Sequence, residues 1–207
     1  MPSFELRHST MGSGKTRDLL SVRYNYIDLR MDVIIFKHII DTRSGKDQVQ
    51  SRTGEKAPAI TITNEDNIFE IVKNITKKPK CVLVDEIHFF QEHHIRELSD
   101  IVDELKIPVI AYGILADFTG KIFDPLIKTL SLFDRIEECP KTVCFCNKKA
   151  TMHLKTVNGK IIKEGNAIQV GDIETKEKKE DDIVIYHPVC RKHWKQGKFF
   201  KRKRKKI

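Results

Sequence analysis

Phe4-Glu-Leu-Arg-His-Ser-Thr-Met-Gly-Ser-Gly-Lys-Thr16 is the stretch around which the chain is organised. A short apolar-leaning run leads into Ser-Gly-Lys-Thr, and a helix-like segment follows at 19–22. This is the strand, tight loop and helix order of a phosphate-binding P-loop. The glycines let the backbone N–H groups point into an anion nest, and the positive end of the helix dipole adds to the attraction. The stretch therefore predicts nucleotide binding.

Two side chains complete the predicted phosphate site. Lys15 would reach the β- and γ-phosphates of a nucleotide, and the hydroxyl of Thr16 would hold Mg²⁺. The first position of the usual pattern, Gly-x-x-x-x-Gly-Lys-Ser/Thr, holds Ser9 in this chain, and a Ser can still occupy a turn. The residues that we assign to nucleotide binding here are Ser9, Thr10, Met11, Gly12, Ser13, Gly14, Lys15 and Thr16.

Strand-like and helix-like segments alternate from Phe4 to about Leu132. Apolar, β-branched runs predict strands at 33–36, 59–62, 81–84 and 108–113. Helical spacing of apolar residues predicts helices up to about 26, at 67–76 and at 95–105. The polar, glycine-containing segment 44–58 predicts a loop above the sheet. The alternation favours an α/β fold, with helices on both faces of a parallel sheet.

The run Cys81-Val-Leu-Val-Asp85-Glu86 is typical of a buried strand that ends in two carboxylates. In a P-loop protein such a strand emerges beside the phosphate loop, at the carboxyl edge of the sheet. Asp85 would there hold the water shell of Mg²⁺. Strands that simply end in solvated acids are common, but the P-loop upstream favours the Mg²⁺ site.

The residue composition and the hydrophobic pattern of the chain change from Ile136 onward. Four of the five cysteines and several short alternating segments follow, and a charged run at 174–182 predicts an exposed loop. A module of about sixty residues buries a modest core and benefits from a bound metal. We predict a P-loop domain at 1–135, a small β-rich zinc-binding domain at 136–197 and a disordered basic tail at 198–207.

Cysteine usage indicates a reducing compartment. The odd number, five, and the clustering of four of them argue against a disulfide framework and for metal binding. The start, Met1-Pro-Ser-Phe-Glu5, lacks the charged and apolar regions of a secretion signal. Within the chain, no apolar run approaches the ~18 residues that span a membrane. We therefore expect a soluble, cytoplasmic protein.

The net charge of +9 belongs largely to the basic tail. The last ten residues carry seven Lys or Arg and no acid, which leaves +2 for the rest of the chain. Such a run is typical of a nuclear-localisation signal or a nucleic-acid contact, and it is equally typical of a solvated terminus.

Together these motifs resemble the type II thymidine kinases, a cytosolic family with a RecA-like P-loop core and a zinc module. The resemblance runs from Phe4 to about Trp194 and rests on five motifs in the same order. They are Met11–Thr16, Asp41-Thr-Arg43, Asp85-Glu86-Ile-His88-Phe89-Phe90, Tyr112-Gly-Ile-Leu-Ala-Asp117-Phe118, and Tyr186 followed by Cys190-Arg-Lys-His193. The resemblance implies transfer of the γ-phosphate of ATP to the 5′-hydroxyl of thymidine, which gives dTMP. It also implies a homotetramer.

The resemblance implies roles for the residues beside the P-loop. Glu86 takes the place of the general base that accepts the hydroxyl proton; its alternative role is that of a second metal-site or surface carboxylate. Arg43, and Arg52 from the adjacent loop, would steady the transferred group. Asp41, Arg43, Asp85 and His88 join the nucleotide-binding set. His88 stands where Gln is usual and Leu115 where Asp is usual, so the roles of those two family side chains do not carry over.

For the nucleoside, the resemblance points to Phe118 as a ring packed on the base, with Phe89 nearby. Without the resemblance, both rings would be interpreted as core aromatics. The family grips thymine with the backbone of a lasso loop, which corresponds here to Ala167, Ile168, Gln169, Val170 and Gly171, closed by Tyr186. Fourteen mostly charged residues separate Gly171 from Tyr186, which makes this lasso longer than is typical. Whether deoxyuridine is also accepted stays open.

The structural zinc that the resemblance implies needs a full set of ligands. Cys190-x-x-His193 has the usual knuckle spacing. The other pair should be Cys-x-x-Cys ending at Cys146, but position 143 is Val, so Cys144 is the nearest replacement and Cys139 a remoter one. We predict zinc ligation by Cys144, Cys146, Cys190 and His193, with Cys139 as the alternative to Cys144. Reduced cysteines without a metal remain the other interpretation.

Two further functions stay open at this point. One is a different P-loop enzyme, such as a nucleotide kinase or an ATPase motor, which would consume ATP without a nucleoside. The other is a zinc-bearing nucleic-acid-binding protein that uses the basic tail, whose affinity would depend on salt.

Overall fold

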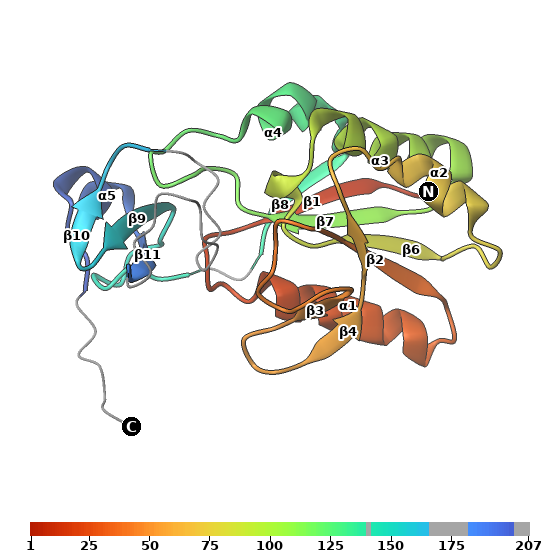
Figure 1. The fold of residues 1–207 in the computed structure, drawn as a ribbon, viewed down its shortest axis with the longest axis horizontal. Helices are drawn as coiled ribbons and strands as arrows, with labels where there is room; N and C mark the ends of the chain where they lie inside the picture. The colour runs from red at the N-terminus through yellow and green to blue at the C-terminus, as the bar shows by residue number, and fades with distance from the viewer. Residues whose placement is uncertain (140–141, 166–181, 201–207) are drawn as a thin grey trace.

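The computed structural model describes residues 1–139, 142–165 and 182–200. A six-stranded parallel sheet with helices on both faces forms one part, which we call the large domain. A three-stranded antiparallel sheet with a short helix forms the other part, the small domain (Figure 1). The predicted α/β fold with a second, β-rich module is confirmed. The lasso residues 167–171 and the tail from 201 onward lie outside the described residues.

The large sheet has the strand order β5-β2-β6-β7-β1-β8, and each neighbouring pair is parallel. Its strands are β1 (Phe4–His8), β2 (Val33–His38), β5 (Ile60–Ile62), β6 (Cys81–Val84), β7 (Val109–Gly113) and β8 (Arg135–Glu138). The last of these crosses the boundary predicted at residue 135, because β8 pairs with β1 up to Glu138.

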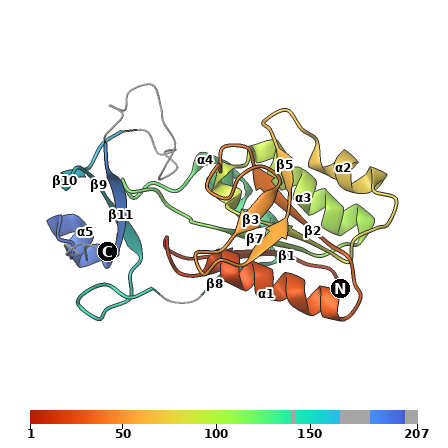
Figure 2. The ribbon, with the colours of Figure 1, turned by 60° about the horizontal axis from the view of Figure 1, so that its bottom comes forward.

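Helices cover both faces of this sheet (Figures 1 and 2). They are α1 (Lys15–Asp28), α2 (Ile68–Asn74), α3 (Glu92–Leu105) and α4 (Asp124–Thr129), with short 3₁₀ turns η1 (Ile87–Phe89) and η2 (Leu130–Leu132). Strand β6 shows why both faces are apolar. Val82 and Val84 pack toward α2, α3 and α4, whereas Cys81 and Leu83 pack toward α1. Side chains alternate across a strand, so a strand buried on both faces needs a continuous apolar run.

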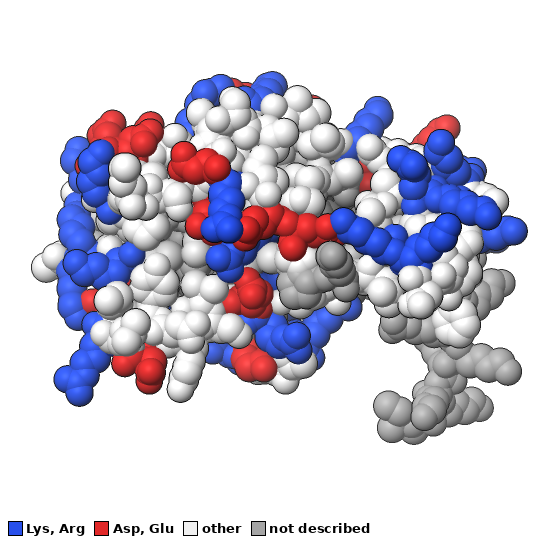
Figure 3. Space-filling model, turned by 180° about the vertical axis from the view of Figure 1, so that it is seen from behind, with Lys and Arg blue, Asp and Glu red and all other residues white. Residues whose placement is uncertain are grey.

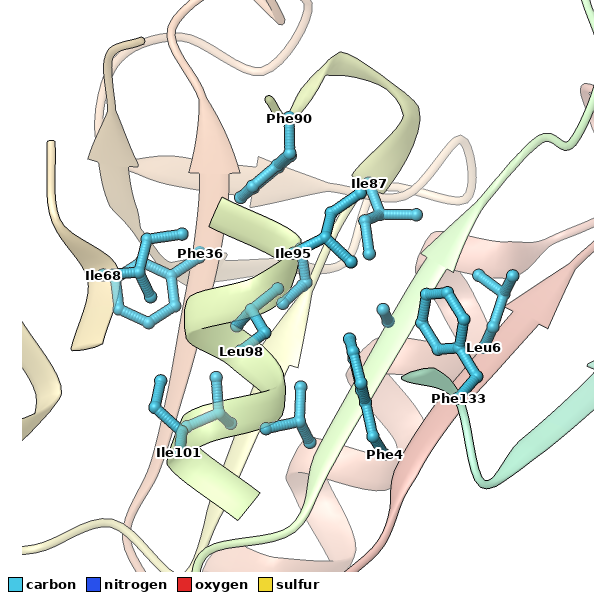
Figure 4. Close-up of a cluster of buried hydrophobic side chains, with 14 of the residues drawn as sticks. Phe4, Leu6, Phe36, Ile68, Ile87, Phe90, Ile95, Leu98, Ile101 and Phe133 are labelled. Carbon is cyan, nitrogen blue, oxygen red and sulfur yellow. The ribbon is translucent and has the colours of Figure 1, made fainter. Parts of the chain in front are cut away.

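The larger apolar core lies between the sheet and α3 (Figure 4). Ile95, Leu98 and Ile101 recur at helical spacing and are fully buried against sheet residues such as Phe4 and Phe36. Full burial of each such side chain stabilises the fold by ~1.5–3 kcal/mol relative to exposure. This core fixes the sheet whose carboxyl edge carries the polar residues described below.

The segment 44–58 corrects one prediction. The sequence pattern predicts a loop here, but the segment contains an antiparallel hairpin of β3 (Gln48–Gln50) and β4 (Lys56–Pro58). Val49 and Ala57 are buried on the α1 side of the large sheet, so the hairpin packs there without joining that sheet. Each strand is three residues long and contributes few apolar residues, which is why the pattern predicted only a loop.

The small part consists of β9 (Met152–Val157), β10 (Lys160–Ile162), β11 (Val184–Val189) and α5 (Arg191–Gln196). Its strand order is β10-β9-β11, with antiparallel pairing throughout. Asn158 and Gly159 connect β9 to β10 with positive φ angles of 50° and 78°, as a tight Asn-Gly hairpin turn requires. Among the described residues, no helix has the length and apolar character to cross a membrane.

The start of α3 makes the stability of the fold sensitive to acid. The fully buried ring of His94 accepts the Gln91 N–H at Nδ1 (3.2 Å) and lies 3.0 Å from the Asp66 carbonyl oxygen at Nε2. This ring is neutral, because burial lowers its pKa from 6.5 to about 4. As the pH falls from 6.5 to about 4, His94 binds a proton in the unfolded chain but not in the folded chain, so the free energy of unfolding falls.

We expect His94→Gln to reduce this acid sensitivity, because glutamine does not titrate. Between pH 7 and pH 5, the wild type should lose ~1–2 kcal/mol more unfolding free energy than the variant. Urea unfolding of both proteins at the two pH values measures the difference. Equal losses would show that His94 is not the group responsible.

Candidate functional site

A cavity of about 590 Å³ opens at the carboxyl ends of β1, β2 and β6. These ends face the small part of the molecule (Figure 1). The cavity is lined by 11–17 after β1, by Asp41, Arg43 and Ser44 after β2, by 50–53 of the β3–β4 hairpin, and by Asp85 and Glu86 after β6. Crevices at the carboxyl ends of parallel strands are where α/β proteins bind ligands.

The loop between β1 and α1 forms an anion-binding nest. Gly12 and Gly14 adopt φ angles of 76° and 92°, a left-handed conformation that glycine adopts without strain. Helix α1 begins at Lys15 without a side-chain cap, so its first N–H groups and its dipole face the cavity. Ser9 has no positive φ and donates its N–H to the Gly113 carbonyl (3.2 Å), which explains why Ser is tolerated in the place of Gly.

Lys15 is held against the loop rather than extended into solvent. Its Nζ donates to the carbonyl oxygens of Thr10 (3.1 Å) and Ser9 (3.5 Å), and the residue is 6% exposed. Burial lowers the pKa of Lys15, while the charges of Glu86 and Asp85 oppose this shift. A nucleotide phosphate entering the nest would therefore meet a desolvated ammonium group.

Thr16 and Asp85 meet across the cavity. The Thr16 hydroxyl lies 3.3 Å from both carboxylate oxygens of Asp85, which is 3% exposed. Burial, and next the neighbouring Glu86, raise the pKa of Asp85. A carboxylate and a hydroxyl beside a phosphate nest are the oxygen ligands that Mg²⁺ takes in P-loop proteins, so this pair fits the metal.

Glu86 lies at the centre of a chain of charges. Its Oε1 accepts a hydrogen bond from Arg43 (2.7 Å), and Arg43 also donates to both oxygens of Asp41 (2.7 and 2.9 Å). Burial alone would raise the pKa of Glu86, but the charges of Arg43 and then Lys15 hold it below its usual range. Glu86 also has a left-handed backbone (φ 51°, ψ 52°), and such strain in a non-glycine residue is typical of functional sites.

His88 lies behind Glu86 and does not line the cavity. Its Nδ1 is 3.6 Å from Glu86 Oε2 and accepts the Ile114 N–H at 3.5 Å. Burial lowers the pKa of His88 to about 4, so the ring is neutral. It packs between the rings of Phe89 and Phe123, with centroids 4.2 and 4.9 Å away. In this position His88 supports Glu86 rather than the phosphate nest.

The two aromatic residues assigned to the nucleoside differ in their surroundings. Phe118 lies near the small sheet, with its ring centroid 6.4 Å from that of Tyr186 on β11. The ammonium group of Lys155 on β9 lies 4.8 Å from the Phe118 centroid. Phe89 lies on the large domain beside His88. Phe118 and Tyr186 thus come together, as the lasso interpretation requires, although the lasso itself is outside the described residues.

Four residues of the small part form a cluster with metal-ligand geometry. The ligand atoms of Cys144, Cys146, Cys190 and His193 all lie within 4.8 Å of one another. The Cys146 and Cys190 sulfurs are 3.8 Å apart, which matches the ~3.8 Å that tetrahedral coordination with Zn–S bonds of ~2.3 Å requires. His193 Nδ1 lies 3.2 Å from the Cys144 sulfur and 3.5 Å from that of Cys190. The donor set and its spacing fit zinc.

Cys139, the alternative ligand, belongs to the large domain. Its N–H donates to the His8 carbonyl (2.8 Å), which extends the pairing of β8 with β1. Burial raises the pKa of Cys139 to about 11, and its side chain packs in the core on the α1 side. Cys139 is therefore a core thiol and lies outside the Cys/His cluster.

Two residues that the sequence patterns missed join the two parts of the molecule. The Trp194 Nε1–H donates to the Phe118 carbonyl (2.9 Å), and the Trp194 ring lies against Gly120. His153 on β9 accepts the Met11 N–H at Nε2 (2.8 Å). Trp194 follows a predicted zinc ligand directly, which was a weak signal, whereas nothing in the local pattern distinguished His153.

Positive charge does not form a continuous surface on the face shown in Figure 3. Lys and Arg side chains gather toward the ends of the molecule, and Asp and Glu side chains lie between them. On this face the described residues therefore give little support to the interpretation as a nucleic-acid-binding protein. From 201 onward, its basic tail lies outside the described residues.

Comparison with known proteins agrees with this geometry. The family described as "Thymidine kinase" matches residues 2–194. A thymidine kinase of Francisella tularensis subsp. tularensis is 44% identical over 199 residues, which cover 95% of this chain and 98% of that protein. Thymidine kinases of Streptococcus gordonii and Enterococcus faecalis are each 40% identical over 195 residues, which cover 94% of this chain and 96% and 95% of those proteins. These relatives are bacterial, so they give the nuclear-localisation interpretation of the tail no support.

The metal cluster gives a direct test, because the chain contains a single tryptophan, Trp194, next to His193. We expect the protein to hold about one zinc ion per chain, and Cys144→Ala to reduce this content strongly. Removal of zinc with a chelator should lower the thermal midpoint by several degrees and shift the Trp194 emission to the red.

Cys139→Ala is the matched control for zinc content. It should retain zinc, since Cys139 lies in the core of the large domain. Loss of zinc in Cys139→Ala together with retention in Cys144→Ala would reverse the ligand assignment.

Proposed function

The chain belongs to the thymidine kinase family, and we propose that its P-loop cavity holds the phosphates of ATP while Glu86 activates the 5′-hydroxyl of thymidine. The activity itself, phosphorylation of thymidine to dTMP, follows from the family and its named relatives. The observation that carries the assignment of residues is the position of Glu86. It lies in the cavity beside Asp85 and the phosphate nest, at the end of β6.

Phosphoryl transfer depends on charge neutralisation and positioning more than on covalent help. Lys15 and the N–H groups of the loop would bind the phosphate chain of ATP, and Arg43 would neutralise the transferred group. Thr16 and Asp85 would hold Mg²⁺, which withdraws charge from the phosphate oxygens. The raised pKa of Asp85 supports this proposal, because a buried carboxylate with an acidic neighbour is stabilised by a divalent cation.

The ion pair with Arg43 regulates the basicity of Glu86. Without phosphates, Arg43 and Lys15 keep the pKa of Glu86 low, which makes it a weak base. When ATP binds, its phosphates would compete for both cations, and the pKa of Glu86 would rise from this low value. Glu86 would then accept the proton of the thymidine hydroxyl as that oxygen attacks the γ-phosphorus, while the bond from the γ-phosphorus to the bridging oxygen breaks and ADP leaves. Glu86 would thus become an effective base only when ATP occupies the site.

The thymine ring would bind between the large domain and the small sheet. Phe118 would pack on the base, with Phe89 and Tyr186 at its borders, and the backbone of 167–171 would hydrogen-bond its polar edge. The closeness of Phe118 to Tyr186 and the hydrogen bond that Trp194 makes to the Phe118 carbonyl support this arrangement. Zinc at the Cys/His cluster would hold α5, and with it Trp194, in place.

We also propose that the enzyme acts in the cytoplasm as a homotetramer. The five cysteines are all unpaired, as a reducing compartment requires. The end of α1 and the turn after it expose Tyr24, Ile27, Leu29 and Met31, an apolar surface that a second copy of the chain can cover. A monomer in sedimentation equilibrium at micromolar concentration would contradict the assembly.

We expect Glu86→Gln to lower kcat by ~10²–10⁴-fold, because it removes the proton acceptor. The KM for ATP should change little, since the phosphate nest and Lys15 remain. Steady-state assays with ATP, Mg²⁺ and thymidine measure both parameters. Glu70→Gln, at an exposed position on α2, is the matched control and should retain wild-type kcat. Undiminished kcat in Glu86→Gln would refute its role as the base.

A further inference from the structure

His153 lies in the small domain, yet its ring reaches the nucleotide loop of the large domain. It sits on β9, is 4% exposed, and its Nε2 accepts the Met11 N–H at 2.8 Å across 142 positions of sequence. The small domain therefore makes a direct backbone contact with the loop that would bind ATP. None of the roles assigned above to residues of the phosphate site depends on this hydrogen bond between Met11 and His153.

The hydrogen bonds of His153 determine which ring nitrogen carries the proton. Because Nε2 accepts from Met11, the proton of the neutral ring must lie on Nδ1. The backbone of Ala116 raises the pKa of the ring as a hydrogen-bond acceptor does, so Nδ1–H is the group available to donate to that carbonyl. Burial, and next the nearby charge of Lys15, lower the pKa of His153 to about 4. The ring is therefore neutral and keeps both contacts at physiological pH.

The two contacts of His153 belong to the two halves of the proposed site. Met11 directly precedes Gly12, whose left-handed backbone shapes the phosphate nest. Ala116 lies two residues before Phe118 and pairs with Ile122 in an isolated β-bridge. One neutral ring thus connects the loop for ATP with the loop for thymidine. A displacement of either loop changes the hydrogen bond that holds the other.

We propose that His153 is a positioning residue that fixes the shape of the nucleotide loop and couples ATP binding to thymidine binding. This inference rests on the proposed function, because it takes the loop at 9–16 as the ATP site and Phe118 as part of the nucleoside site. His153 touches neither substrate. It acts through the Met11 amide on one side and the Ala116 carbonyl on the other.

Two variants of His153 test the proposal. His153→Leu removes both hydrogen bonds, and His153→Gln can accept at Oε1 and donate at Nε2. We expect His153→Leu to weaken binding of a non-hydrolysable ATP analogue and of thymidine by about tenfold each. In the wild type we expect each ligand to enhance the binding of the other. His153→Leu should abolish this enhancement, and His153→Gln should restore most of the affinity and of the enhancement. Isothermal titration with each ligand, alone and in the presence of the other, measures these quantities without turnover.

Zinc content and Trp194 emission are the controls. If both are unchanged in the variants, the small domain is intact. Wild-type affinities and coupling in an intact His153→Leu protein would overturn the proposal. If that variant does not fold, ¹⁵N NMR of the wild-type histidine rings decides. The Nδ1–H tautomer of His153, with a Met11 amide signal that responds to thymidine, supports the proposal, and the Nε2–H tautomer overturns it. Activity retained in Glu86→Gln would refute the base but would leave these binding results intact.

Discussion

The ion pair between Arg43 and Glu86 is the interaction on which the rest of the site depends. Parallel strands β2 and β6 are neighbours, so the residues that follow them lie together at the carboxyl edge of the sheet. Desolvated charges in such a place need partners. Arg43 is the partner of both Asp41 and Glu86, and Lys15 adds a second cation near Glu86. The acids still outnumber the bases here, and burial, followed by the charge of the neighbouring Glu86, raises the pKa of Asp85. A site with this charge distribution is suited to a divalent cation with a phosphate chain.

In the proposed site, the small domain would contribute the side opposite the phosphate loop. It contributes Tyr186 and Lys155 around Phe118, and it contacts the backbone of the large domain through Trp194 and His153. These two hydrogen bonds tie the phosphate loop and the loop that carries Phe118 to the small domain. The Cys/His cluster adjoins Trp194 directly, so a metal in this cluster would stabilise the wall of the nucleoside site as well as the small domain.

Much of the large domain could be predicted from the sequence, because its signals are local. The phosphate loop depends on glycines and a lysine at fixed spacing, and the short, valine-containing apolar run Cys81–Val84 is typical of a strand buried on both faces. The hairpin at 48–58 was predicted as a loop, because its three-residue strands carry too few apolar side chains to show a period. The spacing left Cys139 and Cys144 as alternatives. Only the pairing of β8 with β1, which holds Cys139 in the large domain, separates them. His153 and Trp194 depend on how two domains meet, and no local pattern encodes that.

The central claim is that the cavity at the P-loop and the surface near Phe118 are two halves of one site, so that ATP is split only when thymidine accepts the phosphate. Quantification of ADP and dTMP in one reaction, with and without thymidine, tests this most directly. The account predicts equal amounts of ADP and dTMP when thymidine is present, and almost no ADP when it is omitted. Sustained ADP formation without a nucleoside would contradict it.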